Sequence, residues 1–136
     1  MPLYLTERDV ESLITAGEAV PVLEACFLRM AAGTVENVPR RRLALDGGSF
    51  AVMSAVDPEL GYAGVKAYTA AAGKAVFAVS LFDLRTGELA AVLEADTAGQ
   101  RRTGAASGVA AKHLARSGAT VVCGDDQAGS GTATSA

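Results

Sequence analysis

The chain has 136 residues and a net charge of −3, and half of its residues are hydrophobic. This length suits one domain with a core of its own. The small net charge, with both signs present, speaks against a nucleic-acid-binding surface or a polybasic membrane patch. No apolar run reaches the roughly 18 residues of a membrane span, so neither nucleic acid nor membrane is an expected partner.

Two helices are predicted near the N-terminus. Thr6 followed by Asp9 resembles a capping box with aspartate in place of glutamate, and apolar residues then follow at helical spacing. A second helix is expected to begin between residues 18 and 21 and to end at Gly33, which offers a C-terminal cap.

About five strands are predicted in the middle of the chain. Their expected positions are residues 43–45, 50–53, 63–68, 75–83 and 88–93, with turns at 46–48 and 85–87. The connections are too short for crossovers, so antiparallel pairing is expected.

A long helix is predicted from Asp96 or Thr97, either of which can cap it, to about residue 116. Its many small residues predict a close approach to another element. One more strand is expected at 119–123, and residues 124–136 have no apolar pattern and are expected to be disordered. The predicted fold class is α+β: a mostly antiparallel open sheet of about five to six strands, flanked by N-terminal helices and one long C-terminal helix.

The two cysteines, Cys26 and Cys123, lie far apart without metal-ligand spacing, and His113 is the single histidine. This pattern favours reduced thiols in a cytoplasmic protein, a structural histidine and no metal site.

Isolated cations inside small, apolar segments are the most informative feature of the sequence. Lys66 has no acidic residue from 61 to 76, and Arg102 has none from 98 to 122. A buried cation needs an anion, so a ligand carboxylate or phosphate is one interpretation. Arg102 is expected near the N-terminus of the long helix, where backbone N–H groups also favour an anion, and Thr103 could add a hydroxyl.

Strand periodicity places Arg40 and Arg42 on one face of a strand, with Arg41 on the other face beside Leu43 and Leu45. Two guanidinium groups could then converge on a carboxylate. Periodicity alone favours a solvated charge cluster on an edge strand instead.

Alternatives also stay open for the other cations. Lys66 could equally lie on the exposed face of an edge strand. Arg101 and Arg102 could pair with Asp96 or Glu94 at the surface.

Six ordered segments together resemble the N-terminal part of the ornithine cyclodeaminase/mu-crystallin family: residues 4–10, 30–33, 38–43, 64–68, 81–87 and 102–112. The resemblance implies a substrate-binding and dimerising α+β domain at 1–118, joined in the family to a Rossmann domain that binds NAD or NADP. It matches Arg40, with Arg42 as its neighbour, to the arginine that holds the substrate carboxylate. Lys66 matches a lysine at the substrate carboxylate or reacting carbon, and Arg102 matches an arginine at the start of the long helix.

The chain also departs from the family pattern. It reads Met53-Ser54-Ala55 where Met-Pro-Ala is usual, and Ala51 stands where cyclodeaminases carry a carboxylate. Residues 119–123 are expected to be the first strand of a truncated Rossmann domain, because residues 124–136 lack the expected phosphate loop. A frameshift, truncation or misannotated gene end is the simplest hypothesis for that ending.

The resemblance implies NAD(P)-dependent deamination and cyclisation of an amino acid, of the ornithine-to-proline type, or imine reduction, in the intact enzyme. Lys66 would be the catalytic group, Arg40, Arg42, Lys66 and Arg102 would bind substrate, and Thr103 would contact the cofactor. The chain alone is expected to bind no NAD or NADP and to be inactive, as a homodimer that binds a small amino or imino acid. The alternatives are a non-enzymatic small-acid-binding or dimerisation module, or an inactive gene remnant.

Overall fold

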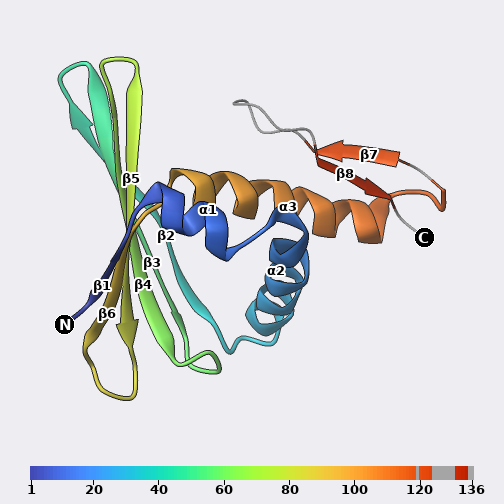
Figure 1. Ribbon diagram of the computed structural model, residues 1–136, viewed down its shortest axis with the longest axis horizontal. Helices are drawn as coiled ribbons and strands as arrows, with labels where there is room; N and C mark the ends of the chain where they lie inside the picture. The colour runs from blue at the N-terminus through green and yellow to red at the C-terminus, as the bar shows by residue number, and fades with distance from the viewer. Residues whose placement is uncertain (119, 124–130, 135–136) are drawn as a thin grey trace.

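The computed structural model describes residues 1–118, 120–123 and 131–134. Six strands form one open sheet in the order β1-β6-β5-β4-β3-β2, and three helices lie together on one side of it (Figure 1). The strands are β1 (Leu3–Leu5), β2 (Glu36–Leu45), β3 (Gly48–Asp57), β4 (Tyr62–Ala71), β5 (Lys74–Asp83) and β6 (Leu89–Glu94). The helices are α1 (Glu7–Leu13), α2 (Ala16–Ala31) and α3 (Asp96–Leu114).

The predicted α+β class and the mostly antiparallel open sheet are confirmed. Strands β2 to β6 pair antiparallel with their sequence neighbours. Strand β1 was not predicted, and it pairs parallel to β6 with Leu3 opposite Ala91. Three residues are too few to display strand periodicity, so the sequence carried no signal for β1.

Both N-terminal helices begin with a capping box. The Thr6 amide donates to Asp9 Oδ2 at 2.9 Å, which confirms the predicted start of α1. Helix α2 begins at Ala16, earlier than predicted, because Thr15 and Glu18 form a second box in which the Thr15 amide donates to Glu18 Oε2 at 2.8 Å. Pro21 therefore lies inside the helix rather than at its start.

The start of α3 differs from the prediction in its cap. Its N-cap residue is Ala95, and neither Asp96 nor Thr97 supplies a capping side chain. The carboxylate of Glu7 does so instead, accepting hydrogen bonds from the Asp96 amide at 2.6 Å and the Thr97 amide at 3.0 Å. The cap comes from a residue far away in the sequence, so local patterns could not reveal it.

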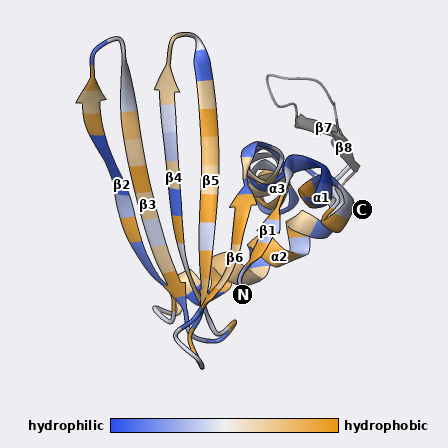
Figure 2. Ribbon diagram, turned by 60° about the vertical axis from the view of Figure 1, so that its left-hand side comes forward, coloured by the Kyte–Doolittle hydropathy of each residue, from blue (hydrophilic) through white to orange (hydrophobic). Residues whose placement is uncertain are grey.

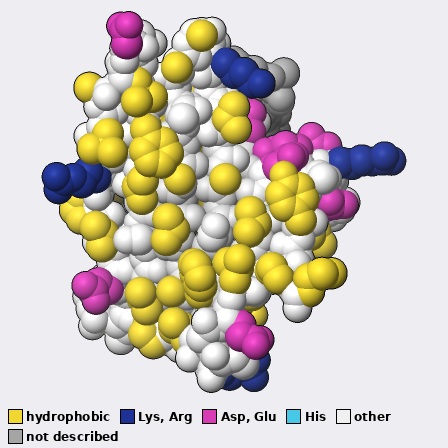
Figure 3. Space-filling model, turned by 90° about the vertical axis from the view of Figure 1, so that its left-hand side faces the viewer, with side chains coloured by type: hydrophobic (Ala, Val, Ile, Leu, Met, Phe, Trp, Pro, Cys, Tyr) yellow, Lys and Arg dark blue, Asp and Glu magenta, His cyan; other side chains and the backbone are white. Residues whose placement is uncertain are grey.

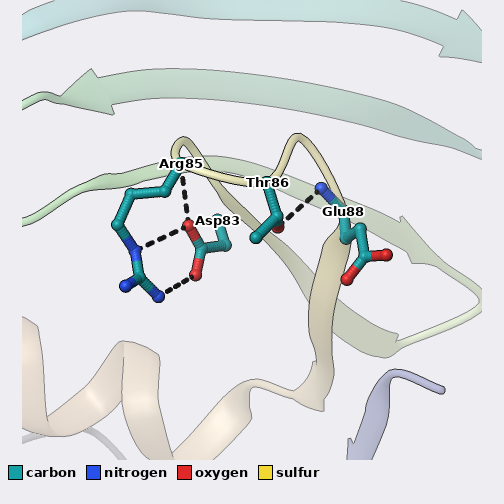
Figure 4. Close-up of polar contacts among 4 residues, drawn as sticks. All are labelled: Asp83, Arg85, Thr86 and Glu88. Atoms are coloured by element: carbon teal, nitrogen blue, oxygen red, sulfur yellow. Dashed lines mark hydrogen bonds and ion pairs between the residues drawn. The ribbon is translucent and has the colours of Figure 1, made fainter.

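The predicted turn between β5 and β6 is confirmed, and its side chains stabilise it (Figure 4). The Arg85 amide donates to Asp83 Oδ1 at 2.8 Å, and the Arg85 guanidinium pairs with Asp83 Oδ2 at 2.9 Å. Gly87 adopts φ +71°, a conformation that favours glycine. The turn thus fixes the antiparallel register of β5 and β6.

The core is built from small side chains. Strands β5 and β6 are hydrophobic along much of their length, and the helices pack beside them (Figure 2). Helices α2 and α3 approach closely, since a Cβ added to Gly108 would lie 3.2 Å from Val20 Cγ2. The predicted close approach of the small residues in α3 is therefore confirmed. The buried hydrophobic residues are Val10, Ala19, Ala51, Ala91, Ala95, Ala105 and Val109.

After α3, the predicted strand at 119–123 corresponds to β7 (Thr120–Cys123), which pairs antiparallel with β8 (Gly131–Thr134). Residues 124–130 and 135–136 of the expected disordered tail lie outside the described residues. Cys26 is a half-buried free thiol. Within the described part of the chain, no helix has the length and apolar character needed to cross a membrane.

Candidate functional site

Lys66 projects from the middle of β4 toward the helices. It lies opposite Met53 of β3 and Val79 of β5 in the sheet. Its ammonium nitrogen is 4.7 Å from the centre of the Phe77 ring, and a Cβ added to Gly99 of α3 would lie 3.2 Å from it. The lysine is half-buried between the sheet and α3, so it does not lie on an open strand face.

An aromatic pair forms the floor of this site. Tyr68 and Phe77 are direct partners in the β4–β5 ladder, with ring centres 5.0 Å apart. The Arg40 guanidinium lies 5.7 Å from the centre of the Tyr68 ring. Two cations from different strands thus lie over neighbouring rings, where the ring faces attract positive charge.

Arg102 brings a third positive charge from α3. Burial lowers the pKa of Lys66, and the nearby charges of Arg102 and Arg40 lower it further, whereas Asp96 acts in the opposite direction. Each cation makes it harder to keep a proton on Lys66. Arg40 and Arg102, both exposed, are thus the two cations whose charge acts on half-buried Lys66, and we call the three residues the cation cluster.

Arg42 lies outside the cation cluster. It shares the helix-side face with Arg40, because Arg42 pairs with Ala51, which in turn pairs with Tyr68. Arg42 is exposed, as Arg40 and Arg102 are, but it is not among the charges that lower the Lys66 pKa. Arg41 faces the other side opposite Val52, as periodicity predicted.

Two expectations about α3 need correction. Arg102 is in the second turn rather than near the free N–H groups, and the first two amides are bonded to Glu7. Within the described residues, Arg101 makes no surface pair with Asp96 or Glu94. It donates instead to the carbonyl oxygens of Glu11, at 2.9 Å, and Ile14 at the end of α1.

Thr103 fits a cofactor contact only as an acceptor. Its hydroxyl donates to the Gly99 carbonyl oxygen at 2.8 Å, so its hydrogen is engaged within α3. A dinucleotide phosphate needs hydrogen-bond donors, and this threonine offers none in the observed conformation.

Within residues 1–118, the ion pairs join Arg29 to Asp57, Arg85 to Asp83 and Lys112 to Glu24, and the His113 ring contacts the same Glu24 carboxylate. None of them involves the cation cluster. The contact of His113 with Glu24, at 2.7 Å, agrees with the predicted structural role of the histidine. In the same range, no group of His, Cys, Asp or Glu has the arrangement of a metal site.

The sequence interpretation missed Phe77 and Gly99. A two-residue turn at Ala72 and Gly73, both with positive φ, aligns Tyr68 with Phe77 across the hairpin. Recognising this turn would have revealed the aromatic pair. The approach of Gly99 to Lys66 depends on how α3 crosses the sheet, which no local pattern specifies.

The opposite face of the sheet forms a second candidate surface. We call it the bare face, because the helices lie on the other side and its side chains stand exposed over much of the view (Figure 3). Leu43 and Val76 are 54% and 53% exposed there, and most charged groups in this view lie toward its margin. The strand registers place seven exposed large apolar residues on this face: Tyr4, Val38, Leu43, Leu45, Val65, Val76 and Phe82.

Comparisons with known proteins identify the family of this chain. The sequence profile of the ornithine cyclodeaminase/mu-crystallin family matches residues 2–133. An alanine dehydrogenase of Archaeoglobus fulgidus is 36% identical over 126 residues, covering 88% of this chain and 38% of the relative. The chain thus spans well under half the length of that relative.

Solved structures of similar enzymes also match this chain over well under half of their own length. A probable ornithine cyclodeaminase from Bordetella pertussis Tohama I matches with a TM-score of 0.83 and 32% identity, over 87% of this chain and 38% of that one. An archaeal alanine dehydrogenase dimer with bound NAD matches at 0.80 and 35%, over 85% and 38%. A Thermococcus litoralis Δ1-pyrroline-2-carboxylate reductase, in complex with NADH and L-proline, matches at 0.80 and 28%, over 85% and 39%.

Proposed function

Because this chain belongs to the ornithine cyclodeaminase/mu-crystallin family, we propose that residues 1–118 bind the carboxylate of a small amino or imino acid. The reaction served would be NAD(P)-dependent deamination, cyclisation or imine reduction. The single observation that carries the proposal is the cation cluster. Lys66 is half-buried beside Arg40 and Arg102, and no cluster member forms an ion pair among residues 1–118.

A carboxylate would relieve the repulsion within this cluster. Guanidinium groups bind carboxylates through two parallel hydrogen bonds, so Arg40 and Arg102 suit this role. An anion beside Lys66 would favour the protonated form and raise the lowered pKa again. Arg42, on the same face, would lie at the margin of the bound acid.

Lys66 is the proposed catalytic group. Its lowered pKa makes the ammonium a better proton donor than an ordinary lysine, and the fixed rings below it limit its movement. It would hold or release a proton at the nitrogen-bearing end of the acid while the arginines orient the carboxylate.

Hydride transfer would come from a dinucleotide rather than from a side chain of residues 1–118. NAD or NADH is present in the relatives from the archaeal alanine dehydrogenase and Thermococcus litoralis, and the dinucleotide would supply hydride transfer. Thr103 is the residue we assigned to the cofactor, and its hydroxyl hydrogen is bonded to Gly99. The function proposed for residues 1–118 is therefore binding, orientation and proton handling.

Ala51 supports an acid without a distal ammonium group. It lies at the position where the family resemblance places the cyclodeaminase carboxylate, and it is fully buried at 0% exposure beside Tyr68. Its methyl side chain has no charge with which to bind such an ammonium group. An alanine- or proline-like acid thus fits better than ornithine.

We also propose that the bare face pairs with a second copy of the chain. Seven exposed apolar residues on one sheet face make a surface that monomeric proteins rarely expose to water. The archaeal alanine dehydrogenase that matches this chain with 35% identity is a dimer. Burying the bare face against its symmetry mate would remove this apolar area from water.

Titration calorimetry would test the acid site. The purified chain would be titrated with L-proline, L-ornithine, pyruvate and a cyclic imine, and then compared with an Arg40→Met variant. Losing one charge-assisted contact should weaken binding by at least about tenfold. Arg41→Met is the matched control, since Arg41 is a sequence neighbour on the opposite face. Equal losses in both variants, or no binding by the unaltered chain, would contradict the proposed site.

A further inference from the structure

Asp96, Gly99 and Arg102 follow one another at three-residue intervals along the first two turns of α3. Side chains three residues apart are neighbours on a helix surface. Gly99 faces Lys66 directly, since a Cβ added there would lie 3.2 Å from the ammonium nitrogen. Asp96 therefore flanks Lys66 on one side of Gly99, and Arg102 flanks it on the other.

This arrangement places both signs of charge beside Lys66. Arg102 disfavours the protonated lysine and Asp96 favours it, so each is close enough to influence the ammonium. Arg40 adds positive charge from β2. The site is thus positive toward the arginines and negative toward Asp96.

The usual explanation for an acidic residue at a helix start is incomplete for Asp96. Such a residue commonly caps the free amides or offsets the helix dipole. The Asp96 and Thr97 amides are already bonded to the Glu7 carboxylate, and Asp96 makes no cap. Among the described residues, its carboxylate accepts one long hydrogen bond, from Gln100 Nε2 to Oδ1 at 3.4 Å. The exposed carboxylate retains most of its capacity to accept hydrogen bonds.

We infer that Asp96 recognises the ammonium group of the bound acid, so that the site selects zwitterionic amino acids over hydroxy or oxo acids of the same size. This inference rests on the proposed carboxylate site. The acid would lie along α3, with its carboxylate toward Arg40 and Arg102 and its ammonium toward Asp96. A monoanion would gain the first interaction only.

L-Alanine and L-lactate provide matched probes, because they differ by an ammonium in place of a hydroxyl. Each would be titrated into the 136-residue chain and into Asp96→Asn, which keeps the shape and removes the charge. We expect the unaltered chain to prefer L-alanine. Asp96→Asn should weaken L-alanine binding by about fivefold, as for one solvent-accessible ion pair, and leave L-lactate binding equal or slightly stronger.

Asp46→Asn is the control, because Asp46 lies in the turn between β2 and β3, away from α3. Equal effects of Asp96→Asn on both probes, or an equal effect of Asp46→Asn, would overturn the inference and leave the carboxylate site in place. Failure of the unaltered chain to bind either acid would overturn the proposed function, and the role of Asp96 with it.

Discussion

Within the described residues, the two faces of the six-stranded sheet differ in what they lack: one has positive charges without a counter-ion, and the other has apolar side chains without a cover. The helix-side face carries α1 beside β1 and β6 and α3 beside β5, with α2 packed on α3, yet it holds a half-buried lysine with two arginines nearby (Figure 1). The bare face has no helix over it, yet it exposes large apolar side chains (Figure 3). An ordinary antiparallel sheet with helices on one side has a polar outer face, so the bare face departs from the usual pattern.

This difference indicates two kinds of partner. The cation cluster on the helix-side face favours binding of a small anion. The exposed apolar side chains of the bare face favour contact with another protein surface. The aromatic pair Tyr68–Phe77 and the close approach of Gly99 hold the charge in place on one side.

The largest expected effect comes from placing charge on the bare face. Leu43→Lys combined with Val76→Lys should raise the dimer dissociation constant by at least about a hundredfold, because four ammonium groups would be desolvated in the symmetric pair. Sedimentation equilibrium would measure this change.

Leu28→Lys is the control for the bare-face variant, since Leu28 is 68% exposed on α2, away from the sheet. A monomeric unaltered chain at micromolar concentration, or a double variant that stayed dimeric, would contradict the proposal that the bare face pairs with a second copy.

Removing the buried charge should have an intermediate effect. Burial, Arg102 and Arg40 lower the pKa of Lys66 below its ordinary 10.5, so the protonated lysine destabilises the folded state. Lys66→Met should therefore raise the free energy of unfolding at pH 7 by up to about 1 kcal/mol while removing acid binding.

The lowered pKa of Lys66 also predicts how the stability of the fold changes with pH. Between the lowered pKa and 10.5, the unfolded chain binds a proton that the folded chain has released, so stability rises with pH. The advantage of Lys66→Met should shrink as the pH approaches 10.5 in urea titrations. Lys74→Met, at the exposed start of β5, is the control. A less stable Lys66→Met at pH 7 would mean that the ammonium is satisfied in the fold.

The smallest expected effect comes from Gly99→Ala. Alanine favours a helix over glycine by roughly 0.5–1 kcal/mol, so the melting temperature should rise. The new methyl group would lie 3.2 Å from the Lys66 ammonium and displace it slightly, so acid affinity should fall a few-fold.

Gly104→Ala separates these two consequences, because nothing lies within 4 Å of a Cβ at that position of α3. It should raise stability and leave affinity unchanged. Identical affinities for the two alanine variants would show that the space at Gly99 has no part in binding.

The correct predictions depended on local signals, although the local capping box at Thr15 and Glu18 and the turn at Ala72 and Gly73 were missed. Capping at Thr6, the hairpin turns and the alternation of Arg40, Arg41 and Arg42 all depend on residues a few positions apart. The family resemblance implied the same α+β class as the predicted elements did, and so supported that prediction independently.

The features that could not be predicted depend on contacts between distant segments. Strand β1 forms only by pairing with β6, and Glu7 can cap α3 only because α3 lies beside α1. In the site, the cations themselves were identified, but the approach of Gly99 to Lys66 depends on helix placement. Tyr68 opposite Phe77 was predictable from the turn at Ala72 and Gly73.

The N-terminal segment is tied to the far end of the sheet by three links. Leu3 pairs with Ala91, the Glu7 amide donates to Glu94 Oε2 at 2.8 Å, and the Glu7 carboxylate caps α3. During synthesis, the ribosome needs roughly 4–18 s to add the intervening residues, at roughly 5–20 residues per second. Residues 3–7 thus emerge well before their partners, and a nascent-chain factor or protease has that interval in which to reach them.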